Sequence, residues 1–295
     1  MLLTDAQKEL AEFLERVARR IVSRLAPIAA LTGVDNLKGL EGGKMLRSRL
    51  AGRLILAGGG AEPELVEISA AAVEMVHTAS LCHDDVIDSA VLRRSAPTLW
   101  RRTGASGAVL VGDILLCEAM NLLIETRNLP LLSAFMEKVT RVCQTEARQE
   151  LVCRGHELGV EACLELAEGK TGSLFAFAAA SAAPAGSDAA ADFARAGLRL
   201  GTAYQLADDL LDVVGSEVEV GKTLGTDGKR EKYTLPQIEP GGVDVAVGHV
   251  RRLCAEAGEA VGNHPAAREA VEEFLARDMG TVLGLIGQSL PHQAK

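Results

Sequence analysis

Two acid-rich segments set the strongest constraint on this chain, because each lies inside a long apolar stretch. Both have the spacing Asp-Asp-x-x-Asp, at residues 84–88 and 208–212, more than a hundred residues apart. On an α-helix the first and last Asp of such a motif lie four positions apart and face the same way. Carboxylates on otherwise buried helices repel one another or take up protons unless cations neutralise them. The fold must therefore bring positive charge to both segments.

The chemistry of these carboxylates favours Mg²⁺. This ion prefers oxygen ligands, keeps several waters and commonly bridges one or two carboxylates to phosphate oxygens. An isolated motif of this kind is more often a solvated acidic turn or helix end. Two matched copies that flank one cavity would instead hold several metal ions and a substrate with several phosphate oxygens, most simply a diphosphate.

Basic residues lie where they could neutralise and orient such a substrate. The run GxxxxGK[ST] does not occur in the sequence, which argues against a P-loop kinase. The candidate cations lie after paired glycines, after the first acid motif, or within short Lys-Thr segments; they are Lys44, Arg47, Arg93, Arg94, Lys170 and Lys222. The segment after the second acid motif, up to Lys232, is the longest expected loop, and it suits a flap over diphosphate.

Composition favours an all-α protein built as one domain over residues 1–295. Hydrophobic residues make up 48% of the chain and aromatic residues only 3%, so Ala and Leu must form the core of closely packed helices. Thr4 and Gln7 predict a capping box at the start of the first helix. Gly- and Pro-containing breaks between helices are expected at 58–63, 127–130, 181–188, 215–236 and 239–242.

Charge and apolar runs exclude several other classes. The net charge of −9 argues against nucleic-acid binding, which needs a basic face. The longest uncharged stretch, 171–187, is short for a membrane span, and Pro184 and Gly186 interrupt it, so no transmembrane segment is expected. The six cysteines lack CxxC spacing and are expected to be reduced core residues of a cytoplasmic protein.

The sequence resembles the trans-isoprenyl diphosphate synthases, the polyprenyl synthetase family. The motifs that carry the resemblance span most of the chain: Gly42-Gly43-Lys44, His77, His83 to Asp88, Arg93-Arg94, Gly112-Asp113, Lys170-Thr171-Gly172, Gln205 to Asp212, Gly221-Lys222, Asp227 and Thr234-Leu235-Pro236. The resemblance implies a helical bundle around a deep central cavity and a homodimer. It also implies head-to-tail condensation of an allylic diphosphate (dimethylallyl, geranyl or farnesyl) with isopentenyl diphosphate.

The resemblance further implies that three Mg²⁺ ions clamp the allylic diphosphate. Their principal ligands would be Asp84, Asp88 and Asp208, with Asp85, Asp209 and Asp212 supporting the metals and their waters. Cations on the same diphosphate would be Arg93, Lys170 and Lys222, while those around isopentenyl diphosphate would be Lys44, Arg47, His77 and Arg94. Thr171 and Gln205 would lie beside the reacting carbon. Met45, Ser48 and Ser95 depart from the residues common in the family.

Product length depends on what lines the helix before the first acid motif. A helical wheel places Val73, His77, Ser80, Asp84 and Asp88 on one stripe. In the family, aromatic residues four or five positions before the first Asp close the channel of short-chain enzymes. This chain has the small residues Ala79 and Ser80 there, and Ala79 lies off the stripe. The resemblance therefore implies a product longer than fifteen carbons.

Two other functions remain open from the sequence. A terpene cyclase on a similar fold would ionise the same substrate without isopentenyl diphosphate, but it usually carries a different second metal motif. A non-catalytic partner subunit of a prenyl synthase tends to lose its acid motifs, and here both motifs are complete.

Overall fold

The computed structural model describes residues 4–32, 43–93, 96–214, 232–238 and 241–289. Helix α1 begins as predicted, because the Gln7 backbone N–H donates to Thr4 Oγ1 at 3.3 Å and the Thr4 N–H donates to Gln7 Oε1 at 2.9 Å. The described α-helices are α1 (Asp5–Thr32), α2 (Leu46–Leu56), α3 (Pro63–Ile87), α4 (Leu99–Glu125), α5 (Leu129–Arg148), α6 (Val160–Ala167), α7 (Ser173–Ala180), α8 (Asp188–Val214), α11 (Gly242–Ala260), α12 (Pro265–Glu273) and α13 (Gly280–Ser289).

The prediction of an all-α fold is confirmed. The predicted breaks near residues 58–63, 127–130 and 181–188 separate helices as expected. A short hairpin after the first acid motif, with strands of two residues each, was not predicted: β1 (Leu92–Arg93) pairs antiparallel with β2 (Ala96–Pro97). Short non-α turns were also missed, namely the π-helices η1 (Gln149–Cys153), η2 (Glu168–Gly172) and η4 (Phe274–Asp278) and the 3₁₀-helix η3 (Leu235–Gln237).

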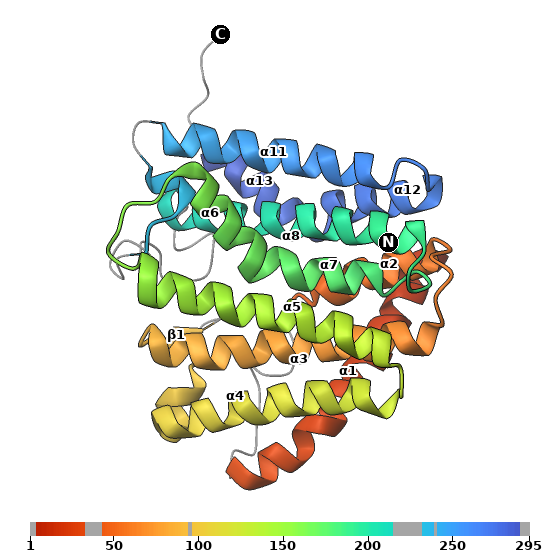
Figure 1. Ribbon diagram of the computed structural model, residues 1–295, viewed down its shortest axis with the longest axis horizontal. Helices are drawn as coiled ribbons and strands as arrows, with labels where there is room; N and C mark the ends of the chain where they lie inside the picture. The colour runs from red at the N-terminus through yellow and green to blue at the C-terminus, as the bar shows by residue number, and fades with distance from the viewer. Residues whose placement is uncertain (1–3, 33–42, 94–95, 215–231, 239–240, 290–295) are drawn as a thin grey trace.

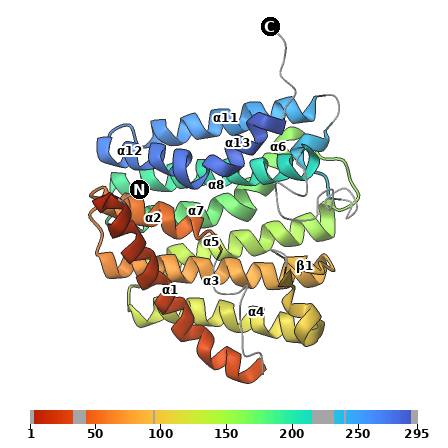
Figure 2. The ribbon, with the colours of Figure 1, turned by 180° about the vertical axis from the view of Figure 1, so that it is seen from behind.

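The long helices are stacked side by side. In Figure 1, α4, α3, α5, α7, α8 and α11 follow one another from the lower edge of the molecule to the upper edge. Seen from behind in Figure 2, α1 crosses obliquely over α3 and α4. The last turn of α3, which carries the first acid motif, and η2, which precedes α7, lie at the same end of this stack.

Helix α7 joins two hydrophobic clusters. Phe175 and Ala179 pack with α8 and α11 in one cluster, whereas Leu174 and Phe177 pack with α3 and α5 in the other. The rings of Phe177 and Phe135 meet edge to face with centroids 5.2 Å apart. Because α7 is apolar on all sides, it can serve both clusters and fix their relative position.

Ser48 explains one departure from the family pattern. Its backbone N–H and its hydroxyl both donate to Glu74 Oε1 at 3.1 Å, and the carboxylate of Glu74 is buried on α3. A proline at this position would lack both donors. The serine therefore anchors α2 on α3 and places the neighbouring Arg47.

Replacing Ser48 by Ala should lower the free energy of unfolding by about 1–3 kcal/mol, because a buried acceptor loses one of its donors. Urea denaturation of both proteins would measure the difference. Ser23→Ala, at an exposed serine that donates to the Arg20 carbonyl of its own helix, should change stability by no more than about 0.5 kcal/mol. Equal effects of the two substitutions would contradict the role assigned to Ser48.

Candidate functional site

The predicted stripe on α3 is partly open from His77 to Asp88, whereas Val73, its first member, is fully buried. Residues 70–76, 78 and 79 are buried, whereas His77, Ser80, Asp84 and Asp88 are only partly buried. Ala79 is fully buried, as its position off the stripe indicated. It belongs to the hydrophobic cluster in which Leu174 and Phe177 pack with α3 and α5. The open face is therefore confined to the acid end of α3, residues 77–88.

At this end, two lysines each lie between two carboxylates. Lys170 Nζ, on η2, is 3.9 Å from Asp84 Oδ2 and 2.7 Å from Glu146 Oε1. Lys232 Nζ is 3.0 Å from Asp88 Oδ1 and 2.6 Å from Glu150 Oε1. Each lysine and its two carboxylates form one rung. The first rung connects α3 to α5, and the second connects the end of α3 to η1. The six residues, here called the carboxylate–lysine ladder, are Asp84, Lys170, Glu146, Asp88, Lys232 and Glu150.

Asp85, the middle carboxylate of the first motif, faces a different partner. Arg93 Nε and Nη2 donate to Asp85 Oδ1 at 3.0 and 2.8 Å, so two nitrogens of one guanidinium bind the same carboxylate oxygen. Burial raises the pKa of Asp85, and the Arg93 guanidinium offsets this only in part. The hairpin thus folds back on the end of α3 and holds Arg93 beside the motif.

The second acid motif is connected to the ladder through two polar side chains. Thr171 Oγ1 donates to Gln205 Oε1 at 2.6 Å, and Gln205 Nε2 donates to Asp209 Oδ1 at 2.8 Å. Thr171 follows Lys170 directly in η2, so a short path of contacts leads from Asp84 to α8. Asp208 is partly buried on α8 and Asp212 is buried. The structure therefore brings the two motifs to one end of the bundle.

Close backbone packing makes this connection possible. A Cβ atom at Gly201 would lie 2.8 Å from the Cα of Gly172, so η2 and α8 can touch only because both residues are glycine. η2 is a π-helix, a distortion that is frequent at functional sites. It places Lys170 toward α3 and the next residue, Thr171, toward α8.

Opposing effects set the charge states of the ladder. Burial lowers the pKa of Lys170, but the carboxylates of Asp84 and Glu146 outweigh burial and raise it above its ordinary value. The pKa of Lys232 is also raised, because Glu150 and Asp88 outweigh its burial. For Glu146, burial raises the pKa more than Lys170 lowers it. Both lysines therefore remain charged at neutral pH.

The predicted cations for a second anion are only partly gathered here. Arg47 is buried, its guanidinium lies 5.1 Å from the centroid of the Phe175 ring, and burial lowers its pKa. Its Nε makes no hydrogen bond within the part of the chain that the structure describes. Lys44 is exposed just before α2, and His77 is partly buried on the open face of α3. Arg94 and Lys222 lie outside the described residues.

His83 faces away from the acid cluster. Its Nε2 is 3.2 Å from the Val109 carbonyl oxygen and 3.3 Å from Asp113 Oδ1, both on α4. A Cβ at Gly112 would lie 2.3 Å from the same nitrogen, so a glycine is needed there for α4 to pack on the ring. His83 therefore fastens α3 to α4 beside the motif.

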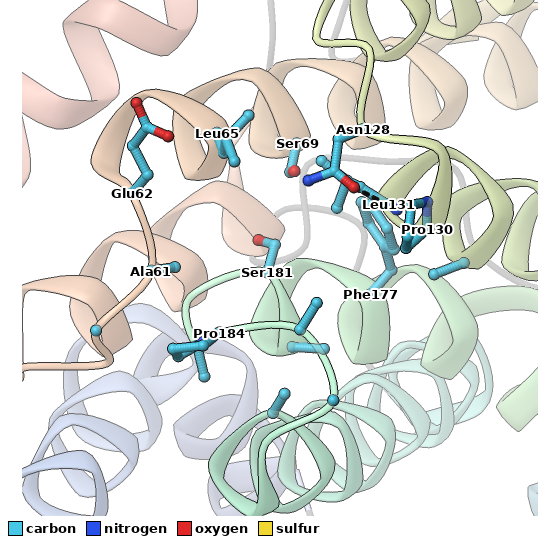
Figure 3. A pocket seen from close by; sticks show the side chains of 17 residues that line it. Ala61, Glu62, Leu65, Ser69, Asn128, Pro130, Leu131, Phe177, Ser181 and Pro184 are labelled. Carbon is cyan, nitrogen blue, oxygen red and sulfur yellow. Dashed lines mark hydrogen bonds between the residues drawn. The ribbon is translucent and has the colours of Figure 1, made fainter.

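A pocket of about 310 Å³ lies at the opposite end of α3. Figure 3 shows Ser69 and Ser181 approaching it from α3 and from the end of α7, with Leu131 and Phe177 on another side. The remaining lining is mostly small and apolar. Ser69 precedes Asp84 by fifteen residues, which on a helix is about 22 Å. The pocket is thus remote from the carboxylates.

Glu146 and Glu150 were not predicted as site residues. They lie in an amphipathic segment that resembles an ordinary solvated helix face, and no motif surrounds them. The only signal was their spacing of four, which equals that of Asp84 and Asp88. The sequence does not show that α3 and α5 lie side by side, so the equal spacing could not be recognised as meaningful.

Comparison with known proteins assigns this arrangement to a family. A model described as "Polyprenyl synthetase" matches residues 36–242. The chain belongs to the polyprenyl synthetase family. The octaprenyl diphosphate synthase of Haemophilus influenzae is 32% identical over 286 residues, covering 94% of this chain and 83% of that protein. The structure of polyprenyl synthase from Caulobacter crescentus CB15, complexed with calcium and isoprenyl diphosphate, has a TM-score of 0.80 and 30% identity, covering 94% and 95% of the two chains.

A third relative is covered less completely. The all-trans-nonaprenyl-diphosphate synthase (geranyl-diphosphate specific) of Rhodobacter capsulatus is 34% identical over 202 residues, which are 67% of this chain and 61% of that protein. These relatives and the family match confirm the prediction that the chain is a prenyltransferase enzyme of the trans-prenyl diphosphate synthase type.

Proposed function

We propose that this polyprenyl synthetase condenses an allylic diphosphate with isopentenyl diphosphate, in an Mg²⁺-dependent head-to-tail reaction, to give an all-trans polyprenyl diphosphate. The observation that carries the proposal is the path of contacts from Asp84 through Lys170 and Thr171 to Gln205 and Asp209. It connects carboxylates, cations and neutral polar groups at one end of the bundle, as the ionisation of a diphosphate ester requires.

The donor set suits hard divalent cations. Asp84 and Asp88 offer oxygen ligands four residues apart, with side chains that are 17% and 14% exposed. Among the described residues no three His, Cys, Asp or Glu side chains are grouped closely enough to hold a metal ion. The relative from Caulobacter crescentus was solved with calcium and isoprenyl diphosphate, which supports metal sites here. Three Mg²⁺ ions held by both acid motifs are part of the proposal.

Each side chain near the motifs has a proposed task in the reaction. When bound, the divalent cations would absorb the negative charge of the departing diphosphate. Arg93, Lys170 and Lys232 would hold that diphosphate as charge develops on it. The Gln205 amide oxygen and the Thr171 hydroxyl would stabilise the positive charge on the allylic carbon, in a site from which water is excluded.

A second anion site is proposed around Arg47. Its buried Nε has no acceptor among the described residues and is available to an oxygen of isopentenyl diphosphate. Lys44, His77 and Arg94 would complete the contacts to isopentenyl diphosphate, as the family resemblance implies. Lys222 would instead join Arg93 and Lys170 on the allylic diphosphate. Holding both substrates in fixed orientation supplies much of the acceleration.

A product longer than fifteen carbons is also proposed. The partly open face of α3 leads from Asp84 past the small side chain of Ser80 to His77. Residues 69–76 beyond it are buried, so a growing chain would have to displace side chains there to reach the pocket near Ser69. The growing chain is apolar, and the pocket is lined mainly by alanine, leucine and phenylalanine side chains. The terminal units of the chain would therefore be directed along α3 toward this pocket.

Chromatography of reaction products tests the proposal. The purified protein would receive Mg²⁺, labelled isopentenyl diphosphate and allylic diphosphates of five, ten or fifteen carbons. A ladder ending beyond twenty carbons is expected. Release of hydrocarbon and diphosphate without elongation would support a terpene cyclase instead, and complete inertness would support a partner subunit.

A cytoplasmic homodimer, with each chain forming one domain, is a further part of the proposal. Leu110 and Ile124 are 61% and 54% exposed on α4, and together with the exposed Cys117 they form an apolar stripe with seven-residue spacing. The prediction of buried core cysteines is therefore wrong for Cys117 and also for Cys143, which is exposed on α5. By length and composition α3 and α4 could each cross a membrane, but the apolar window of α3 is 72% buried. Asp113, 57% exposed in the middle of α4, disfavours a bilayer around that helix.

The double substitution Leu110→Glu with Ile124→Glu should convert a dimer into monomers, because the buried stripe would then carry unpaired charges. Light scattering after gel filtration would measure the mass, expected near twice the chain mass of 31.0 kDa before substitution and near that mass after it. Val245→Glu, at a 38% exposed valine on α11, is the control and should leave the mass unchanged. A monomeric unsubstituted protein would contradict the proposed dimer.

A further inference from the structure

Within the carboxylate–lysine ladder, both lysines lie closer to the carboxylate from the α5 side than to the one from α3. Lys170 Nζ is 2.7 Å from Glu146 and 3.9 Å from Asp84. Lys232 Nζ is 2.6 Å from Glu150 and 3.0 Å from Asp88. Each lysine is thus held mainly by a glutamate that has no assigned role in the proposed reaction.

The ladder carries an excess of negative charge and is largely shielded from water. Four carboxylates face two ammonium groups, and Arg154 Nη1 pairs with Glu150 Oε2 at 3.2 Å, so one negative charge remains when all seven side chains are ionised. Exposed fractions of the six side chains run from 8% for Lys232 to 27% for Lys170. Attraction and repulsion among these groups are therefore stronger than on a solvated surface.

A divalent cation at Asp84 and Asp88 would compete with the lysines for the same oxygens. An ammonium group within 4 Å of a carboxylate opposes a second cation there, unless another anion draws the ammonium away. Glu146 and Glu150 are those anions, because each already forms an ion pair with its lysine, at 2.7 and 2.6 Å. Their four-residue spacing matches that of Asp84 and Asp88, so each glutamate serves one rung.

We propose that Glu146 and Glu150 are positioning residues that keep Lys170 and Lys232 off Asp84 and Asp88 when a divalent cation occupies those carboxylates. The inference rests on the proposed function, which supplies the cation. It gives the two glutamates a role without direct contact to metal or substrate. The lysines, released from α3 but retained at the site, are then available to a diphosphate.

The test measures metal binding by the intact protein without substrate. Mn²⁺ has the oxygen preference of Mg²⁺, and its free concentration can be followed by electron paramagnetic resonance. Glu146→Gln and Glu150→Gln should each raise the dissociation constant for Mn²⁺ about tenfold, because a lysine then turns to the α3 carboxylate. The matched control is Glu165→Gln, since Glu165 pairs with Arg148 on the surface and is 62% exposed; its constant should not change. Circular dichroism would establish that the variants fold.

A double-mutant cycle separates positioning from direct ligation. If Glu146 acts through Lys170, adding Glu146→Gln to Lys170→Met should change the Mn²⁺ constant less than about twofold. A tenfold loss that persists without Lys170 would overturn the inference, as would unchanged binding in the single variants. Asp84→Asn tests the proposed metal site itself. If this variant binds Mn²⁺ as the unsubstituted protein does, the proposed metal site is wrong as well.

Discussion

Replacing Asp84 by Asn should reduce turnover at least a thousandfold and leave the fold intact. Asp84 is the first carboxylate of its motif, and its Oδ2 lies 3.9 Å from Lys170 Nζ at the end of α3. The amide keeps the shape of the side chain but removes the negative charge that would hold a divalent cation and, through it, the diphosphate. Steady-state rates of isopentenyl incorporation, measured at saturating Mg²⁺, would give the loss.

Asp5→Asn is the matched control. Asp5 has a side chain that is 93% exposed in the first turn of α1, far along the chain from either motif. This variant should retain full activity. Far-ultraviolet circular dichroism of the Asp84 variant should match that of the unsubstituted protein, since one neutralised side chain at a helix end leaves the packing of α3 unchanged. Undiminished Mg²⁺-dependent turnover in the Asp84 variant would remove this residue from the site.

Replacing Ser80 by Phe should shorten the products to twenty carbons or fewer, with little loss of the first condensation. Ser80 lies on the partly open face of α3, one turn from Asp84, and its hydroxyl donates only to the His77 carbonyl at 2.8 Å among the contacts of the described residues. A phenyl ring there would fill the space through which the apolar chain is proposed to extend. Thin-layer or liquid chromatography of the dephosphorylated products would reveal the shift.

Two further variants make this result specific. Ser80→Ala removes the hydroxyl without adding volume and should leave the product ladder unchanged. Ala79→Phe places the same ring one residue earlier, where Ala79 is 0% exposed in the core, so it should lower stability by about 1–3 kcal/mol. An unchanged ladder in Ser80→Phe would exclude this face of α3 as the path of the chain.

Local rules predicted much of the fold and the first part of the site. The capping box of Thr4 and Gln7 follows from side-chain capping, the helix breaks from Gly and Pro, and the stripe that separates Ser80 from Ala79 from helix periodicity. All three depend only on residues close in sequence. The spacing of Asp84 and Asp88 placed both carboxylates on one face of a helix before any packing was known. Their proposed role as metal ligands came from that spacing together with the family resemblance.

What the sequence did not reveal depends on contacts between distant residues. Glu146 becomes significant only because η2 brings Lys170 against it, and the hydrogen bonds of Ser48 to Glu74 join two helices through residues that are 26 positions apart. The burial of Arg47 against Phe175 is of the same kind, since a lone arginine near a helix start is usually solvated. Lys222 and Arg94 lie outside the described residues, so their proposed contacts stay predictions.

The π-helical turn η2 limits how this region can vary in length. A π turn holds one residue more than the corresponding α turn, and removing that residue would rotate everything after it by about 100° relative to everything before it. Lys170 and Thr171 could not then face α3 and α8 at the same time. During evolution, loops such as 154–159 can gain or lose residues at low cost, whereas the segment 168–172 should not tolerate insertions or deletions.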